Sequence, residues 1–372
     1  MTEDNIFNTE NQKEGPPSED NSFGANHQPA ENREKAELSE VQNSVPSHLK
    51  QNFDSVAFAE KSAIKKDANI IGASFLIMTG IIYFLNFLIV IVSVVVQSFN
   101  AKASGILWEP AVLQVQQILF ATVSFTVPFI AVFKLANIRI SDLIAFSAPK
   151  KQTVLPFFLF GIAFCSFANI ASSIAESIFK SANINYEVTA QENPEGIFGF
   201  ILSLLATVAV PALAEEFACR GLMLGLLRKF GDSFAIIASA LLFGLMHGNF
   251  EQMPFAFLVG LVLGFITVKS GTIWIAVAVH AFNNMVSIVF DYFLCDVSNL
   301  IKNVGYTIFL IVCLLLGIVA VFLFRGKEKD LYKFTPSGMK TGEKQKMIWF
   351  FTSVPIIIYI VICVLESLQF FV

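Results

Sequence analysis

Two adjacent carboxylates and an arginine interrupt a stretch that is otherwise apolar: Glu215, Glu216 and Arg220 in LAEEFACRGLM. Two further apolar stretches each carry a histidine, His247 and His280. An ionisable group inside a membrane helix costs about 2.5 to 3.5 kcal/mol on insertion scales and by default marks a functional site. Carboxylate and imidazole side chains are common proton donors and acceptors in catalysis. Their placement therefore predicts a site of acid–base chemistry.

The helical repeat assigns different roles to the two carboxylates. Glu216 and Arg220 are four residues apart on one helix face, so they can pair. Glu215 is turned away from Glu216 by about 100° and stays free. The pair gives Glu216 a counter-ion, whereas Glu215 is the candidate reactive acid.

The same reasoning groups the polar residues of the histidine-bearing segments. His280 and Asn284 are four residues apart and project together, and Asn283 is a less definite member of that face. At about 1.5 Å per residue from the expected cytoplasmic helix ends, Glu215, His247, His280 and Asn284 lie roughly 12 to 21 Å deep. These depths predict one layer that brings a carboxylate, two imidazoles and an amide together.

The elements that must position these groups are membrane helices. The chain has 372 residues, of which 55% are hydrophobic and 15% charged, with a mean hydropathy of +0.65. A bilayer core needs about 20 apolar residues per helix. The sequence predicts an all-α polytopic membrane helical bundle of about nine spans, at 70–97, 112–134, 154–178, 197–228, 233–248, 252–269, 272–294, 304–324 and 347–371.

The polar N-terminal stretch and the basic residues predict the topology. Residues 1–60 are rich in Asn, Glu, Ser and Gln and are predicted to be a disordered cytoplasmic tail. With a cytoplasmic N-terminus, the external connections hold only Lys102, Lys180 and Lys302, and the other loop lysines and arginines fall inside. We expect a multi-pass protein of the cell membrane.

Local features favour a bend and close helix contacts near the acids. Pro211 has no N–H to donate to the carbonyl of Thr207, so the helix should bend or widen there. The GxxxG pairs at 221/225 and 260/264 permit close approach of neighbouring helices.

Other readings of the same residues remain open. Glu216 with Arg220 can be a purely structural ion pair, and a lone intramembrane histidine can serve as a hydrogen-bond donor between helices. A transporter would need charges along a pathway and often has inverted repeats, neither of which is found. A catalytically silent membrane scaffold or immunity protein stays an alternative.

Three motifs resemble a known family of intramembrane proteases. EEFACR is similar to EExxxR, FGLMH to FxxxH and HAFNN to HxxxN of the CPBP family, also called the CAAX-protease and bacteriocin-processing or Abi family. The resemblance covers about residues 197–294. It divides the chain into the tail, N-terminal transmembrane helices at 61–196, a catalytic core at 197–294 and C-terminal transmembrane helices at 295–372.

The resemblance implies an all-helical membrane core and an endopeptidase activity. By motif position, Glu215 and His247 are expected to activate water, and His280 and Asn284 to stabilise the oxyanion. The supporting residues are expected to be Glu216 and Arg220.

The resemblance also implies the kind of partner. The expected substrate is a membrane protein or peptide, processed in the CAAX manner or in bacteriocin-related maturation or self-immunity. The bilayer is the other expected partner, and nucleic acid is not expected.

A zinc site is the alternative to metal-free catalysis. Glu215, His247 and His280 could form a two-histidine, one-carboxylate zinc site. However, the histidines lie on different helices with no HExxH pair, and the motif gives Asn284 the role of a hydrogen-bond donor, which suits an oxyanion hole. We therefore expect no cofactor and keep zinc as the alternative.

Overall fold

The described part of the chain is entirely helical. The computed structural model describes residues 47–99, 105–182, 192–325 and 333–370, and every regular element in these ranges is a helix. The all-α prediction is confirmed. The chain divides into two units, Met1–Ser55 and Val56–Val372, and the helices that form the site belong to the second.

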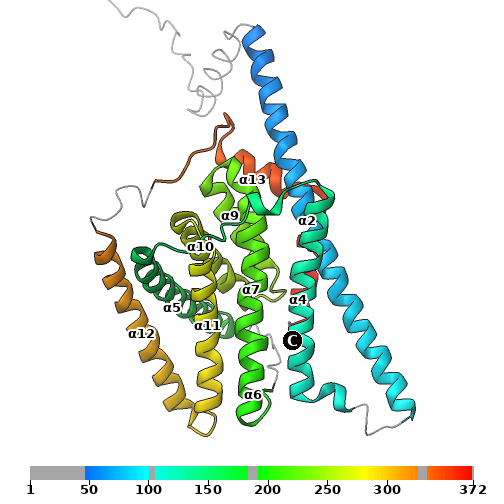
Figure 1. The fold of residues 1–372 in the computed structure, drawn as a ribbon, viewed down its shortest axis with the longest axis vertical. Coiled ribbons are helices and arrows are strands. Elements are labelled where there is room, and N and C mark those ends of the chain that lie inside the picture. The colour runs from blue at the N-terminus through cyan, green and yellow to red at the C-terminus, as the bar shows by residue number, and fades with distance from the viewer. Residues whose placement is uncertain (1–46, 100–104, 183–191, 326–332, 371–372) are drawn as a thin grey trace, which may run out of the picture. The chain divides into compact units, whose positions relative to one another are not determined.

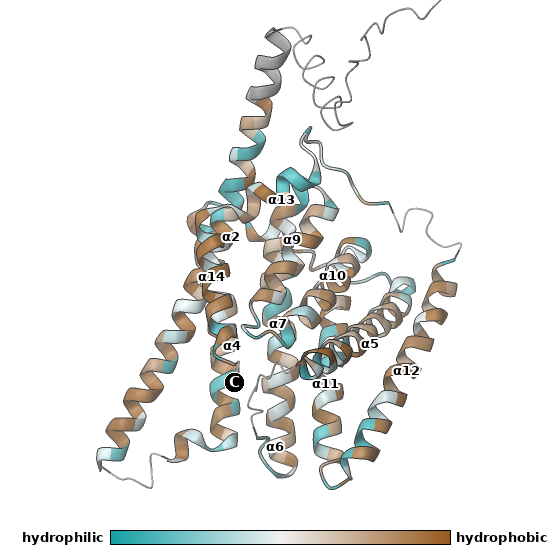
Figure 2. Ribbon diagram, turned by 180° about the vertical axis from the view of Figure 1, so that it is seen from behind, coloured by the Kyte–Doolittle hydropathy of each residue, from teal (hydrophilic) through white to brown (hydrophobic). Residues whose placement is uncertain are grey.

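Within the described ranges, seven helices are long and apolar enough to cross a membrane. Large apolar side chains cover much of the outward surface of these helices, and polar residues gather around α13 (Figure 2). The chain is thus a multi-pass membrane protein. The spans are α2 (Ser47–Phe99), α4 (Pro110–Leu135), α5 (Lys151–Ser181), the continuous run Gly196–Phe230, α10 (Gln252–Ser270), α11 (Trp274–Phe293) and α12 (Asn299–Phe324) (Figure 1).

The predicted count of nine was too high by one or two. The expected fifth span is α9 (Asp232–Leu245), whose 14 residues are fewer than a bilayer core requires. The expected ninth is a pair, α13 (Glu343–Phe351) and α14 (Val354–Leu368), bent by 74°. Pro355 lies in the first turn of α14, where its missing N–H prevents a continuous helix. Counting the pair as one span gives eight.

The predicted tail can be compared with the structure only in part. Residues 1–46 lie outside the described residues. The helix α2 begins at Ser47, so the helical part of the chain starts earlier than the predicted boundary at residue 60.

The fourth span has a widened turn on each side of the acidic pair. It consists of α6 (Gly196–Ser203), the π-helical η3 (Leu204–Ala209), α7 (Val210–Glu216), the π-helical η4 (Phe217–Met223), α8 (Leu224–Leu227) and the 3₁₀ turn η5 (Arg228–Phe230). Pro211 follows η3 and cannot donate to Thr207, as the sequence predicts. Such π turns in α-helices are frequent at functional sites.

Glycines allow close contacts at two of the predicted positions. A Cβ on Gly260 of α10 would lie 3.0 Å from the Cα of Ala240 in α9, so these two helices pack backbone to backbone. A Cβ on Gly225 would lie 2.7 Å from the carbonyl oxygen of Leu143. Larger side chains at either position would push the fourth span and α10 away from their neighbours.

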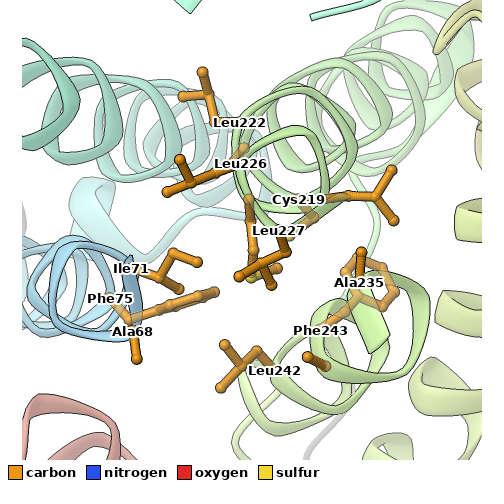
Figure 3. Packing of buried hydrophobic residues seen from close by; sticks show 14 of the residues in the cluster. Ala68, Ile71, Phe75, Cys219, Leu222, Leu226, Leu227, Ala235, Leu242 and Phe243 are labelled. Atoms are coloured by element: carbon orange, nitrogen blue, oxygen red, sulfur yellow. The ribbon is translucent and has the colours of Figure 1, made fainter. Parts of the chain in front are cut away.

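An apolar cluster holds the C-terminal half of the fourth span. The ring of Phe75 in α2 stacks on Tyr359 at 4.7 Å and meets Phe129 edge-on at 5.2 Å. Close contacts of this kind contribute dispersion energy, which drives helix association where lipid is as apolar as the side chains. Figure 3 shows the α2 side chains facing the fourth span and α9, with Ala68, Ile71, Phe75, Leu222, Leu226, Leu227 and Leu242 labelled.

Candidate active site

The two adjacent glutamates point to different surroundings. Glu215 lines a cavity and its side chain is 14% exposed, whereas the side chain of Glu216 is fully buried. Their positions on consecutive residues of α7 account for the difference, because the helical repeat turns one from the other. Glu215 is the acid that faces the cavity, in line with the prediction.

One carboxylate oxygen of Glu216 binds two side chains. Arg220 Nη1 donates to Glu216 Oε1 at 3.0 Å, which confirms the predicted pair. His280 Nδ1 lies 3.0 Å from the same oxygen. A carboxylate accepts hydrogen bonds when ionised, so Nδ1 carries the proton in this contact. Glu216 therefore fixes the orientation of His280, a relationship that the spacing along one helix could not indicate.

Arg220 connects the fourth span to two further helices. Its Nη2 donates to the carbonyl oxygen of Gly260 in α10 at 3.3 Å, and its guanidinium carbon lies 4.1 Å from the centre of the Phe243 ring in α9. A guanidinium over an aromatic face is stabilised by the ring quadrupole, most strongly where water is absent. The positive charge of Arg220 is therefore held between these helices, and Arg220 does not line the cavity.

His247 follows α9 in a turn. Its Nδ1 lies 2.8 Å from the carbonyl oxygen of Phe243, which can only accept, so Nδ1 is the protonated nitrogen. In the neutral imidazole, Nε2 is then a free acceptor. The ring of Phe243 contacts both histidines edge-on, with centroid distances of 5.1 Å to His247 and 6.0 Å to His280. Phe243 thus spaces the two imidazoles.

The turn itself is held by Asn249 and Gly248. Asn249 Nδ2 donates to the carbonyl oxygen of His247 at 3.0 Å, and Asn249 Oδ1 accepts from the backbone N–H of Gln252 at 2.8 Å. Gly248 adopts φ +65°, which favours glycine because it has no Cβ. These contacts fix the backbone of the turn and so the position of His247 relative to α9.

Asn284 satisfies the backbone group that Pro211 leaves open. Its Nδ2 donates to the carbonyl oxygen of Thr207 at 3.0 Å. That carbonyl has no partner at Pro211, four residues on, because proline lacks an N–H. Asn283 Nδ2 donates in turn to Asn284 Oδ1 at 3.3 Å. The widened turn η3 and the polar face of α11 therefore dock onto each other.

All four predicted catalytic residues line one cavity of about 580 Å³. Glu215 comes from α7, His247 from the turn after α9, and His280 and Asn284 from α11. Nε2 of His280 lies 3.9 Å from Oε2 of Glu215, and that oxygen is buried without a protein hydrogen-bond partner in the described part of the chain. The supporting pair, Glu216 and Arg220, lies behind this wall.

Comparison with known families agrees with the geometry. Residues 197–286 match the model of a family described as type II CAAX prenyl endopeptidase Rce1-like. The segment is an Rce1-like domain. It contains the residues of all three motifs, and the match agrees with the CAAX-protease family that the sequence resembles. No curated protein and no solved structure matched the chain.

The Rce1-like domain also receives contributions that the motifs did not predict. Phe243 was named only as the first letter of its motif, yet its carbonyl and its ring both contact the site. Gly260 was noted for close packing alone, and its carbonyl accepts from Arg220. Asn169 and Tyr306 come from outside the Rce1-like domain, on α5 and α12, and line the same cavity. The sequence signal that could have identified these two residues is a polar side chain within an otherwise apolar helix.

A further carboxylate lies at the edge of the cavity. Glu251 directly precedes α10 and lines the cavity. Its partial burial, together with the nearby Glu176 carboxylate, raises its pKa, and Lys180 partly offsets the increase. The cavity is therefore lined by a second carboxyl group besides that of Glu215.

The arrangement of the Rce1-like domain differs from that of a preformed zinc site. Within the described ranges, no three side chains of His, Cys, Asp or Glu are grouped to hold one metal ion. His280 uses Nδ1 for Glu216 and His247 uses Nδ1 for a carbonyl, so only their Nε2 atoms could bind a metal. Zinc binding would require those atoms and Glu215 to converge further. The expectation of metal-free chemistry stays a prediction.

Proposed function

We propose that this chain is an intramembrane endopeptidase whose Glu215 and His247 activate a water molecule for attack on a peptide bond. The proposal rests on one observation above all. Glu215 places a buried carboxylate oxygen, without a hydrogen-bond partner among the described residues, at the wall of a cavity that His247 and His280 also line. Such a group is costly unless something polar occupies the space in front of it.

The geometry supports a division of labour between the two water-binding groups. The free Nε2 of His247 can accept one hydrogen bond from the water, while the Glu215 carboxylate removes the other proton as the oxygen attacks the carbonyl carbon. The protonated Glu215 then gives that proton to the amine of the departing peptide. No proton is gained or lost over the two steps, and the site returns to its starting state.

In this proposal, His280 and Asn284 stabilise the negative charge that develops on the carbonyl oxygen of the substrate. Asn284 uses one amide N–H for Thr207 and keeps the second for the cavity. A protonated His280 would donate from Nε2, and with Arg220 it would balance the charges of Glu215 and Glu216. Donors fixed before reaction are worth about 10²- to 10³-fold in rate each.

The substrate class follows from the location and from the family. The described helices surround the cavity with membrane-spanning segments, so a membrane-associated protein or peptide is the substrate that reaches it. The family description names a CAAX prenyl endopeptidase. We therefore propose a prenylated C-terminal peptide as the first candidate, and a bacteriocin-like or self-immunity peptide as the second.

The test compares two peptides and three forms of the protein. Purified protein in liposomes is given a farnesylated peptide ending in Cys, two aliphatic residues and a variable residue, or the same peptide without the farnesyl group. The forms are the wild type, Glu215→Gln and the control Glu109→Gln, an exposed residue ahead of α4. We expect Glu215→Gln to lower kcat by about 10³-fold while Glu109→Gln cleaves like the wild type.

The results separate the functional alternatives. Cleavage of the farnesylated peptide alone supports the CAAX-type substrate, and equal cleavage of both peptides supports a general membrane peptidase. If Glu215→Gln keeps full activity, Glu215 is not the catalytic base. A wild type that cleaves neither these peptides nor the membrane peptides of its own cell would support the silent scaffold instead.

A further inference from the structure

A row of hydrogen bonds crosses the cavity wall and ends at Asn284. Tyr306 Oη of α12 donates to Asn169 Oδ1 of α5 at 3.2 Å, and Asn169 Nδ2 donates to Asn283 Oδ1 at 3.3 Å. Asn283 Nδ2 donates to Asn284 Oδ1 at 3.3 Å, and Asn284 Nδ2 donates to the carbonyl of Thr207 at 3.0 Å. Four side chains from three helices are thus joined to the widened turn of the fourth span.

The direction of this row is fixed at the Thr207 end. A backbone carbonyl can only accept, so the amide nitrogen of Asn284 must face it and the amide oxygen must face Asn283. The same requirement passes to Asn283 and to Asn169, whose oxygen is left to accept from the Tyr306 hydroxyl. Reversing any one amide would place two donors or two acceptors against each other. The row therefore permits one orientation of Asn284.

Packing alone would not hold these side chains in place. Asn169, Asn283 and Tyr306 line the main cavity on one side and a second cavity of about 20 Å³ on the other. A side chain between two spaces has fewer dispersion contacts to restrict its rotation. Hydrogen bonds in such low-dielectric surroundings are stronger and polarise one another. We infer that the row, rather than shape, sets where the second N–H of Asn284 points.

We propose that Asn169 and Tyr306 are positioning residues for Asn284, acting through Asn283 to aim its free amide N–H at the carbonyl oxygen of the substrate. This inference rests on the proposed function, in which Asn284 stabilises the oxyanion. It assigns a part in the reaction to α5 and α12, two helices outside the matched segment 197–286. A purely structural role for the row would stabilise helix packing and leave the rate of the chemical step unchanged.

A double-mutant cycle distinguishes positioning from packing. Asn169→Leu keeps the size and removes both hydrogen bonds of the row, together with the bond from Asn169 Nδ2 to the carbonyl oxygen of Cys165. Tyr306→Phe removes only the hydroxyl. Each is made in the wild type and in Asn284→Ala, and kcat is measured in liposomes under saturating peptide. The controls are Ser173→Ala and Thr307→Val, nearby hydroxyls on α5 and α12 that bond to the backbone of their own helices.

If Asn169 and Tyr306 position Asn284, the effect of their substitution on kcat should depend strongly on whether Asn284 is present. In the wild type we expect Asn169→Leu to lower kcat by about tenfold and Tyr306→Phe by about threefold, with KM unchanged, as for the loss of one or two neutral hydrogen bonds. In Asn284→Ala each change should alter kcat by less than about twofold, because the group they orient is absent. The controls should leave kcat as it is in both backgrounds.

The outcomes separate this inference from the proposed function. Equal losses in both backgrounds, or no loss from either substitution, would overturn the positioning role while leaving Asn284 as a donor. An Asn284→Ala protein with wild-type kcat would remove the oxyanion role and the inference with it. If Asn169→Leu does not accumulate, Tyr306→Phe decides, since it changes a single oxygen at the far end of the row.

Discussion

His280 holds Glu216 Oε1 through Nδ1 at 3.0 Å, the same oxygen that binds Arg220. Two adjacent glutamates therefore have separate tasks. Glu216 belongs to the framework, because its removal would leave Arg220 and the orientation of His280 unsupported. Glu215 belongs to the cavity, where its buried Oε2 has no hydrogen-bond partner in the described ranges.

The two glutamates should respond differently to the same substitution. We expect Glu215→Gln to remove cleavage and to accumulate in membranes like the wild type. Glu216→Gln should lower thermal stability and abundance as well, because breaking a buried ion pair by removing one partner costs about 3 to 5 kcal/mol. Abundance is measured by immunoblot and stability by fluorescence-detected chromatography after heating. Glu215→Gln is the matched control, and equal loss of protein in both variants would contradict the separate roles.

Chelation should leave the enzyme active. The proposed reaction uses a carboxylate base and hydrogen-bond donors, so dialysis against a strong chelator should change kcat by less than about twofold, whereas loss of a required zinc ion would remove the activated water. Metal content and cleavage are measured on the same preparation. Zinc at one equivalent that leaves together with activity, and restores it when added back, would establish the two-histidine, one-carboxylate site instead.

Cys295 reports the orientation of the chain. Among the five cysteines, Cys295 alone is exposed, in the connection between α11 and α12 that the basic residues predict to be external. A membrane-impermeant maleimide should label it on intact cells, and Cys295→Ser should abolish the labelling. Label that reaches Cys295 only in inside-out vesicles would reverse the proposed orientation.

Asp232 should make the folding stability of the protein depend on pH. Burial raises its pKa, but hydrogen bonds from the Thr335 backbone and from Arg228 outweigh this and lower it. A lowered folded-state pKa adds stability above the unfolded value of about 3.9, and this stability is lost as the pH falls through the folded value. At pH 7, Asp232→Asn should therefore lower the free energy of unfolding by about 2 kcal/mol. The variant should accordingly unfold at a lower temperature than the wild type.

The same comparison at low pH provides the control. As the pH falls through the lowered folded-state pKa, the wild-type carboxyl takes up a proton, so the difference in stability between Asp232→Asn and the wild type should shrink. The melting temperatures are measured in detergent across the pH range. A constant difference at all pH values would mean that the charge of Asp232 does not contribute.

The sequence predicts contacts within one helix better than contacts between helices. The four-residue spacing was sufficient to pair Glu216 with Arg220, and the missing N–H of Pro211 was sufficient to predict a widened turn. The bond from Asn284 to Thr207 joins two helices whose relative rotation and height depend on packing along the whole bundle. Spacing along either helix alone carries no information on that register.

The number of spans shows a second limit of local reasoning. The apolar pattern of α9 resembles that of a membrane helix, but Met246 to Glu251 form a turn after 14 helical residues. Hydropathy registers composition and not helix length, so the apolar pattern predicts a crossing at α9, although its 14 residues are fewer than a bilayer core requires. The 74° bend after α13 was missed for the same reason, although Pro355 could have indicated it.

The early end of α9 bears on how water reaches the proposed site. At about 1.5 Å per residue, this helix is about 21 Å long, which is shorter than the roughly 30 Å of a bilayer core, so a helix that starts at one membrane surface ends within the core. Backbone that is not helical is tolerated at such a depth only inside protein or beside a water-filled space. In the proposed hydrolysis, this turn lines the cavity and leaves a volume inside the protein that the attacking water can occupy. Hydration of that volume, as well as arrival of a peptide, can then limit the rate of turnover.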